Sequence, residues 1–303
     1  MAEIWRDHLT PEAYETFRKH GYYSMLHLNT TLRIVQLFSA YYDAMNWNLA
    51  QNPQDPHNQI AWLNHTLHAA ERDGEQVFLI GHIPPGDVFS LTHWSYYYKA
   101  LIDRFSNIIV GQFYGHTHYD EFKLSRSTFE GETAAGVVWI VPTLTAYPRK
   151  NPSIRIYDVD VETKHVVDYH QYRLYVEEAN ELYEKATTDE ERLGSAQWKL
   201  AYSFKDYYGV DNMEHETIAG IVEKMKVDKE HSRKVLYMMH AEGPDSKARI
   251  DEQYWGYCRF GNAVFGEFFE CNGHTGNFLD YMFSTWNFIF GAWYDIKDNP
   301  EYL

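Results

Sequence analysis

Residues 77–86, VFLIGHIPPG, decide the fold prediction, because four apolar residues in a row lead directly into a turn that contains His82. A continuous apolar run that follows a helical segment is typical of a strand buried on both faces. Residues 108–114 repeat this arrangement and end in Gly115-His116-Thr117-His118. Loops at the carboxyl ends of sheet strands are where α/β proteins build their sites. Both histidine turns are therefore candidate functional loops.

The segments around these two strands alternate between strand and helix patterns. Residues 22–28 and 32–38 are short and apolar, which predicts a hairpin. Asp55-Pro56 predicts the start of a helix and Gly74 its end. The apolar face of that helix would consist of Ile60, Leu63, Leu67 and Ala70. The other expected elements are a helix at about residues 94–105 and strands at residues 137–141, 154–159 and 166–174.

The composition changes beyond about residue 175. Glu, Ala, Lys and Leu dominate from residue 176 to 241, which predicts helices, whereas residues 243–303 favour no single element. We therefore predict an α/β sheet domain over residues 1–175, followed by a helical C-terminal region over residues 176–303. The aromatic stretch at residues 255–294 is either a packed helical subdomain or a membrane-facing surface, since Trp and Tyr favour interfaces.

Composition and charge limit the classes of function. Of the 303 residues, 45% are hydrophobic and 17% aromatic, which is enough apolar material for a packed core. The net charge of −16 disfavours binding to a nucleic-acid polymer, because phosphate backbones need clustered Lys and Arg. The first ten residues do not predict a signal peptide, and no run of about 18 apolar residues predicts a membrane span.

Two further features bear on the cellular compartment. Asn29 and Asn64 each begin an Asn-x-Thr sequon, so both are candidate glycosylation sites and hint at a secretory route. Cys258 and Cys271 would pair in an oxidising compartment and remain thiols in a reducing one. A pair of cysteines is too few for a four-cysteine zinc site.

The histidines of the two turns are candidate metal ligands. His116 and His118 are spaced so that both side chains can point the same way where the loop turns, and Gly115 permits that turn. Neutral imidazole is a good ligand for zinc, iron or manganese. His82 would join the other histidines if the two strands are neighbours. The alternative is that these are ordinary polar residues in a chain with 16 histidines.

Longer motifs around both turns resemble acid sphingomyelinase and the ASM-like phosphodiesterases, which belong to the calcineurin-like metallophosphoesterase superfamily. GHIPPG at residues 81–86 and GQFYGHTHYDEF at residues 111–122 look like the last two metal motifs of that family, and their spacing is similar. The resemblance runs over about residues 1–175 and continues more weakly into the helical C-terminal region. It also includes Asp55-Pro56 with Gln59, Trp62 and Leu63, and Asn151-Pro152 with Arg155 and Tyr157.

The resemblance implies the second half of a four-layer α/β/β/α metallophosphoesterase sandwich that holds two zinc ions. By resemblance, His82 and His116 would bind one ion, and His118 would bind the other. Zinc lowers the pKa of a bound water, so that a hydroxide can attack phosphorus near neutral or acidic pH.

Three further residues are candidates for supporting roles. By resemblance, Tyr147 would touch a phosphate oxygen of the substrate. Asp120 and Glu121 would orient a ligand histidine, as carboxylates beside metal sites commonly do. The alternative for Tyr147 is a tyrosine in a structural loop. The alternative for Asp120 and Glu121 is a pair of surface carboxylates.

The activity that the resemblance implies is zinc-dependent hydrolysis of sphingomyelin to ceramide and phosphocholine in an extracellular or lysosomal setting, with a membrane surface as a candidate partner. An ASM-like phosphodiesterase that acts on nucleotides is a second hypothesis. The family's Asp-x-His, Gly-Asp and Gly-Asn-His metal motifs are not found upstream of His82, so we expect a chain that is cut on its N-terminal side. A non-catalytic remnant of the family is therefore a third hypothesis.

Overall fold

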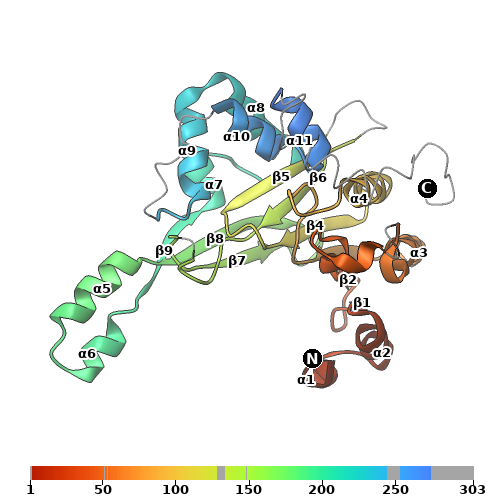
Figure 1. Cartoon of the computed structure of the whole chain (residues 1–303), viewed down its shortest axis with the longest axis horizontal. Coiled ribbons are helices and arrows are strands. Elements are labelled where there is room, and N and C mark those ends of the chain that lie inside the picture. Colours follow the sequence, from red (N-terminus) through yellow and green to blue (C-terminus); the bar gives the residue numbers. More distant parts are fainter. Residues whose placement is uncertain are drawn as a thin grey trace. The chain divides into compact units, whose positions relative to one another are not determined.

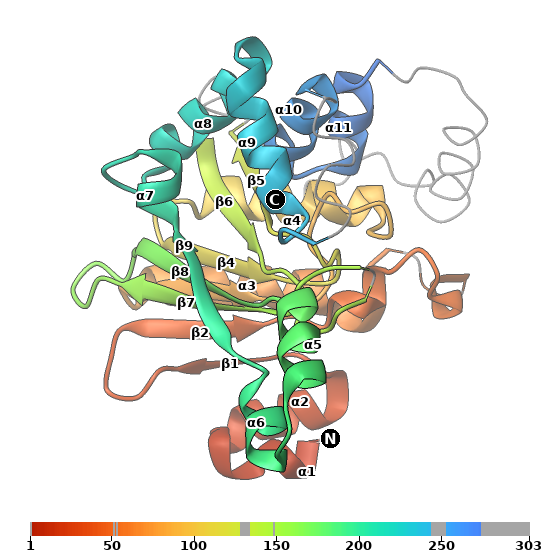
Figure 2. The same cartoon turned by 90° about the vertical axis from the view of Figure 1, so that its left-hand side faces the viewer.

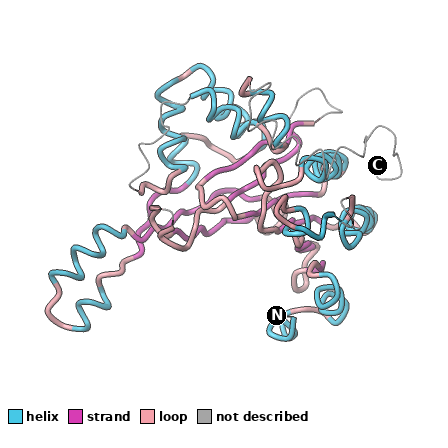
Figure 3. The backbone as a smooth tube through the Cα atoms, in the orientation of Figure 1, coloured by secondary structure: helices cyan, strands magenta, loops and turns pink. Residues whose placement is uncertain are grey.

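The computed structural model describes residues 2–273, apart from residues 51, 53, 128–133, 148 and 244–252. The chain forms two compact units. Among the described residues, the first consists of those within Met1–Tyr114, Lys123–Trp139 and 258–273, and the second of those within Gly115–Phe122 and Ile140–Tyr257. Figure 3 distinguishes the helices, strands and loops along the backbone. Each unit is built around its own sheet.

The sheet of the first unit has six strands in the order β1-β2-β3-β4-β6-β5. β1 pairs antiparallel with β2, whereas β2, β3 and β4 run parallel to one another. The two apolar strands of the sequence prediction are thus direct neighbours in the sheet. The strand bounds are β1 Tyr23–Leu26, β2 Leu32–Gln36, β3 Gln76–Ile80, β4 Ile109–Tyr114, β5 Glu121–Arg126 and β6 Ala134–Ile140.

Helix α3 (Gln59–Arg72) shows how the first unit forms its core, since it packs against β3 and α4 (Figure 1). The Asp55 carboxylate accepts hydrogen bonds from Ile60 N at 2.9 Å and Ala61 N at 3.1 Å, which satisfies amide groups of the first helical turn. Leu63 and Leu67 are fully buried. The other helical elements are α1 Ala2–Trp5, η1 Arg6–His8, α2 Pro11–His20, η2 Ser39–Tyr42, η3 Trp47–Ala50, η4 Pro56–Asn58, α4 Thr92–Arg104 and α11 Phe265–Cys271.

The second unit contains a three-stranded antiparallel sheet in the order β7-β8-β9. The strands are β7 Ser153–Val159, β8 Val166–Leu174 and β9 Trp198–Ser203. Figure 2 shows α5 and α6 side by side as a helical hairpin inserted between β8 and β9. The helices are α5 Val176–Lys185, α6 Asp189–Gly194, α7 Phe204–Tyr208, α8 His215–Val227 and α9 Lys229–Met239, and α10 Gln253–Gly261 begins in this unit and ends in the first.

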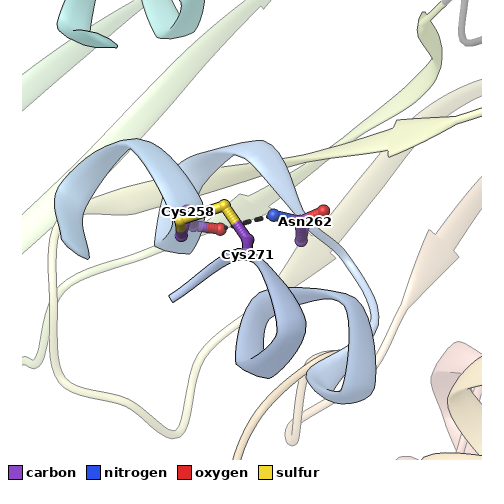
Figure 4. Close-up of a disulfide and its surroundings, with 3 residues drawn as sticks. All are labelled: Cys258, Asn262 and Cys271. Atoms are coloured by element: carbon purple, nitrogen blue, oxygen red, sulfur yellow. Dashed lines mark hydrogen bonds between the residues drawn. A yellow bond between two sulfur atoms is a disulfide. The ribbon is translucent and has the colours of Figure 1, made fainter. Parts of the chain in front are cut away.

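A disulfide between Cys258 and Cys271 resolves the alternative that the sequence left open (Figure 4). It joins the last part of α10 to the end of α11. The Asn262 side-chain amide donates a hydrogen bond to the Cys258 carbonyl at 2.8 Å, which fixes the turn between the two helices. A crosslink that closes a loop of about 15 residues stabilises a fold by about 3 kcal/mol in the chain-entropy model.

Most predicted elements of the sheet-rich part are confirmed. The hairpin corresponds to β1 and β2, the Asp55–Gly74 helix to α3, the second helix to α4, and the remaining strand segments to β3, β4, β6, β7 and β8. The α/β class is also confirmed. Half of a four-layer sandwich and the boundary at residue 175 stay predictions.

Two segments differ from the sequence interpretation. Residues 176–241 were expected to be helical, but β9 lies within them and pairs with β8, because WKLAYS alternates in the manner of a strand. β5 was not predicted. Part of the aromatic stretch at 255–294 forms α10 and α11, while residues 274–294 lie outside the described residues. Among the residues that the structure describes, no helix has the length and apolar character needed to span a bilayer.

Candidate functional site

The His82 turn begins where β3 ends and is held by hydrogen bonds from its own backbone. The buried Ser39 hydroxyl accepts from His82 N at 3.1 Å and from Ile83 N at 2.7 Å. Gly81 N donates to the Phe113 carbonyl at 3.0 Å. The His82 side chain is exposed. The chain therefore fixes the backbone of this turn and leaves its imidazole at the surface of the first unit.

Two glycines of this turn are required by close packing. A Cβ at Gly81 would lie 2.4 Å from Tyr114 Cε1. Gly86 has φ of 71°, and a Cβ there would lie 2.6 Å from the Ala263 carbonyl carbon. Larger side chains at either position would force the turn away from its neighbours.

The His116–His118 turn belongs to the second unit and has a strained backbone. His116 has φ of 69° and His118 φ of 63°, so both adopt the left-handed conformation. For residues with a Cβ this conformation costs roughly 1–2 kcal/mol each. Local hydrogen bonds stabilise the turn, from Thr117 N to the Gly115 carbonyl at 2.8 Å and from Tyr119 N to Thr117 Oγ1 at 3.2 Å.

The His118 imidazole has the arrangement of a metal-ligating histidine. Its Nδ1 lies 2.9 Å from the Tyr147 carbonyl oxygen. A carbonyl can only accept, so Nδ1 carries the proton and the lone pair of the neutral ring lies on Nε2. Metal-ligating histidines commonly donate their other ring N–H to a backbone carbonyl in this way. The Tyr147 side chain is 75% exposed, so this contact uses its backbone and not its hydroxyl.

Asp120 follows this turn and lies in a buried charged cluster. Its Oδ1 accepts a hydrogen bond from Arg155 Nη2, and its Oδ2 accepts from Arg173 Nη2 at 2.7 Å and from the Tyr202 hydroxyl at 2.9 Å. Burial and the charge of Asp120 both raise the pKa of Tyr202 well above its usual range, so the hydroxyl remains a donor. Asp120 and Glu121 are both buried, so the alternative of surface carboxylates is wrong.

Glu242 extends this cluster and balances its charge. Its Oε2 accepts hydrogen bonds from Arg173 Nη1 at 2.5 Å and from the Tyr175 hydroxyl at 2.8 Å. Two guanidinium groups thus face two carboxylates, which is the pairing that buried charges require. The partners of Asp120 lie 35, 53 and 82 residues along the chain, and no local pattern around Asp120 signals them. The sequence signals are Arg155, which belongs to the family-like motif at Asn151-Pro152, and Arg173, which is in phase with Tyr169 and Gln171 on the inward face of β8.

The fit of these residues to zinc is incomplete within the described ranges. In His118 the Nδ1 contact with the Tyr147 carbonyl leaves Nε2 as the atom that could face a ligand. However, residues 2–273 outside the stated gaps contain no group of three or more His, Cys, Asp or Glu side chains arranged to hold a metal ion. His82 belongs to the first unit, and His116 and His118 belong to the second. The zinc roles of the three histidines therefore stay predictions.

The remaining sequence-predicted residues have clear local settings. Asn29 is exposed at the β1–β2 turn with φ of 54°. Asn64 is half-buried on α3, and the hydroxyl of Thr66 in the same sequon is buried and donates to the Trp62 carbonyl at 2.9 Å. Asn29 is thus the more accessible acceptor, although glycosylation of either residue stays a prediction. The roles predicted for Tyr147, Asp120 and Glu121 also stay predictions.

No protein-family model matches the chain. Among curated proteins, the chain is 34% identical over 227 residues to Sphingomyelin phosphodiesterase A of Dictyostelium discoideum, and this alignment covers 74% of the chain and 37% of that protein. It is also 34% identical over 251 residues to Sphingomyelin phosphodiesterase of Bos taurus, with 82% and 38% covered. The chain belongs to the ASM-like phosphodiesterase family.

Another relative in the ASM-like family carries a different substrate in its name. The chain is 31% identical over 239 residues to Cyclic GMP-AMP phosphodiesterase SMPDL3A of Homo sapiens, and the alignment covers 75% of the chain and 50% of that protein. The chain spans 37–38% of the length of the Dictyostelium discoideum and Bos taurus relatives and 50% of this one.

Proposed function

We propose that this chain forms part of a zinc-dependent phosphodiesterase that hydrolyses sphingomyelin to ceramide and phosphocholine. The observation that carries the proposal is the His118 imidazole, whose Nδ1 proton is directed at the Tyr147 carbonyl so that Nε2 is the atom for a ligand. Relatives named sphingomyelin phosphodiesterases support the reaction class.

In this proposal His82, His116 and His118 supply imidazole ligands to zinc. Bound zinc would supply an acidified water and positive charge beside the phosphoryl oxygens. Hydrolysis would join the water oxygen to phosphorus, break the phosphorus–oxygen bond to ceramide and deliver one water proton to the ceramide oxygen. Tyr147 is exposed and its carbonyl faces His118, and in this proposal its hydroxyl would contact a phosphate oxygen of the substrate.

The expected setting of this activity is extracellular or lysosomal. The Cys258–Cys271 disulfide supports an oxidising compartment, because such bonds persist there and are rare in the cytosol. A membrane surface would present sphingomyelin to the enzyme, and we expect no nucleic-acid polymer as a partner, since the chain has a net charge of −16.

The test compares His118→Ala with His170→Ala in the full-length protein that contains this chain. His170 is a histidine of the same unit whose Nε2 pairs with Asp158 at 2.9 Å, and it has no role in the proposal. We expect His118→Ala to remove zinc-dependent release of phosphocholine and to lower the zinc content, while His170→Ala retains both. Unchanged zinc content and activity in His118→Ala would refute the metal role.

Nucleotide phosphodiester hydrolysis is the second candidate. It is favoured by the match to Cyclic GMP-AMP phosphodiesterase SMPDL3A, of which the chain spans 50%. Turnover of sphingomyelin and of a cyclic dinucleotide, measured on the same preparation, separates the two substrate classes. If neither is hydrolysed and no zinc binds, the non-catalytic remnant is the remaining hypothesis.

A further inference from the structure

The His116–His118 turn needs a structural reason for its conformation. Two residues with Cβ atoms adopt positive φ within three positions, at 69° and 63°. Such backbone persists only where the surroundings determine it, and it is common at functional sites. The backbone hydrogen bonds within the turn are short-range, and the His118 Nδ1 contact with the Tyr147 carbonyl holds only a side chain, so the backbone needs a further tie to the rest of the second unit.

Asp120 supplies that tie through both its backbone and its carboxylate. Asp120 N donates to the Met239 carbonyl at 2.9 Å. Its two carboxylate oxygens are divided between the two arginines, with Arg155 at Oδ1 and Arg173 at Oδ2. Only Tyr119 separates His118 from Asp120, so the position of the Asp120 backbone constrains where the His118 backbone can lie.

The two arginines are themselves fixed on neighbouring strands of a rigid sheet. Arg155 on β7 donates from Nε to Gln171 Oε1 at 2.9 Å and lies 3.9 Å from the Tyr169 ring centroid. Arg173 on β8 is fully buried and pairs with Glu242. A planar guanidinium with several fixed partners holds a carboxylate in one orientation, which a lysine does not.

We propose that Arg155 and Arg173 are positioning residues for His118. Arg155 binds Asp120 Oδ1 and Arg173 binds Asp120 Oδ2, and together these bonds keep His118 in its ligand orientation. This inference rests on the proposed metal role of His118. Neither arginine contacts metal or substrate in it. Their effect reaches the imidazole through Asp120, and it maintains the Nδ1 contact with the Tyr147 carbonyl.

The first experiment needs no metal. The full-length protein, with ¹⁵N-labelled histidine, is examined by long-range ¹H–¹⁵N NMR near pH 8, and His118 is assigned with His118→Gln. We expect a single Nδ1–H tautomer in the parent protein and its loss in Arg155→Lys and Arg173→Lys. The matched control is Arg33→Lys, which alters a part-buried ion pair with Glu75 in the first unit and should leave the His118 signal unchanged.

Folding of each variant is checked by its unfolding midpoint. If folded arginine variants retain the parent tautomer, the inference is overturned. If neither arginine variant folds, Tyr202→Phe carries the test, because it removes the hydrogen bond to Asp120 Oδ2, along with that between the Tyr202 and Tyr169 hydroxyls, and keeps the ring. A changed His118 signal in Tyr202→Phe then supports the inference, and an unchanged signal overturns it.

The second experiment measures zinc affinity by calorimetric titration of the same proteins. We expect the arginine variants to bind zinc roughly 10–100-fold more weakly than the parent, which is the usual effect of losing a partner that orients a ligand. Arg33→Lys should match the parent. If the parent protein binds no zinc, the proposed function fails, while the NMR experiment still decides the role of the arginines.

Discussion

The His82 turn and the His116–His118 turn share a glycine–histidine start after a buried parallel strand, yet different interactions anchor them. The first is held by a neutral hydroxyl from Ser39 and by close packing at Gly81 and Gly86. The second is held by a buried carboxylate between two guanidinium groups. Neutral hydrogen bonds and close packing hold the first turn, and buried ion pairs hold the second. The two turns should therefore be sensitive to different substitutions.

The largest effect is expected from Asp120→Ala, which leaves Arg155 and Arg173 buried without their shared carboxylate. Removing one partner of a buried ion pair costs about 3–5 kcal/mol of unfolding free energy. Urea unfolding measures this loss. Asp158→Ala on the half-exposed end of β7 serves as the control and should change stability far less. If Asp120→Ala and Asp158→Ala lose similar amounts of unfolding free energy, the buried ion pairs of Asp120 contribute no more than an exposed pair does.

Gly81→Ala tests the close packing that holds the His82 turn. The added Cβ would lie 2.4 Å from Tyr114 Cε1, and the Tyr114 hydroxyl bonds to that of Tyr98 at 2.9 Å, so the ring is not free to move. Overpacking of this kind costs roughly 1–3 kcal/mol, and we expect the upper end. The matched control is Gly220→Ala, in helix α8 with open space around it, which should stabilise the protein by about 0.5–1 kcal/mol.

Ser39→Ala removes the hydroxyl that accepts from two backbone amides of the His82 turn. Leaving buried donors without a partner costs about 1–3 kcal/mol each, and we expect a total near 1–2 kcal/mol, because water can reach the exposed end of the turn. Thermal unfolding gives the size of the loss. Ser39→Thr retains the hydroxyl, and equal losses in both variants would point to packing and not to the hydrogen bonds.

The smallest effect concerns Tyr175 and alkaline pH. Burial and the hydrogen bond to Glu242 raise the pKa of Tyr175 to about 12. Because the folded pKa is above the unfolded value of about 10, the contribution of this group is present below pH 10 and is lost as the pH rises towards 12. Tyr175→Phe should therefore lose less stability than the parent between pH 9 and pH 11.5. Identical pH slopes in urea unfolding would contradict this assignment.

The strands that lead into both turns could be predicted from the sequence, because their conformation follows from residues that are adjacent in the chain. Apolar runs before Gly81 and Gly115 predicted β3 and β4, and their adjacency is confirmed. β9 was missed because the surrounding residues 176–241 have a helical composition, while its strand conformation comes from pairing with β8. The burial of Asp120 was missed for a related reason, since its partners lie on strands distant in the sequence.

The close packing of Gly86 against Ala263 determines when the His82 turn can finish folding during translation. The backbone of Ala263, which lies between the two disulfide-bonded cysteines, forms part of the wall against which Gly86 packs. The ribosome has made β3 and the His82 turn long before residue 263 emerges. The turn therefore completes its packing only after translation of the region around Cys258–Cys271. A nascent chain halted before that region should lack the packing of Gly86 against Ala263.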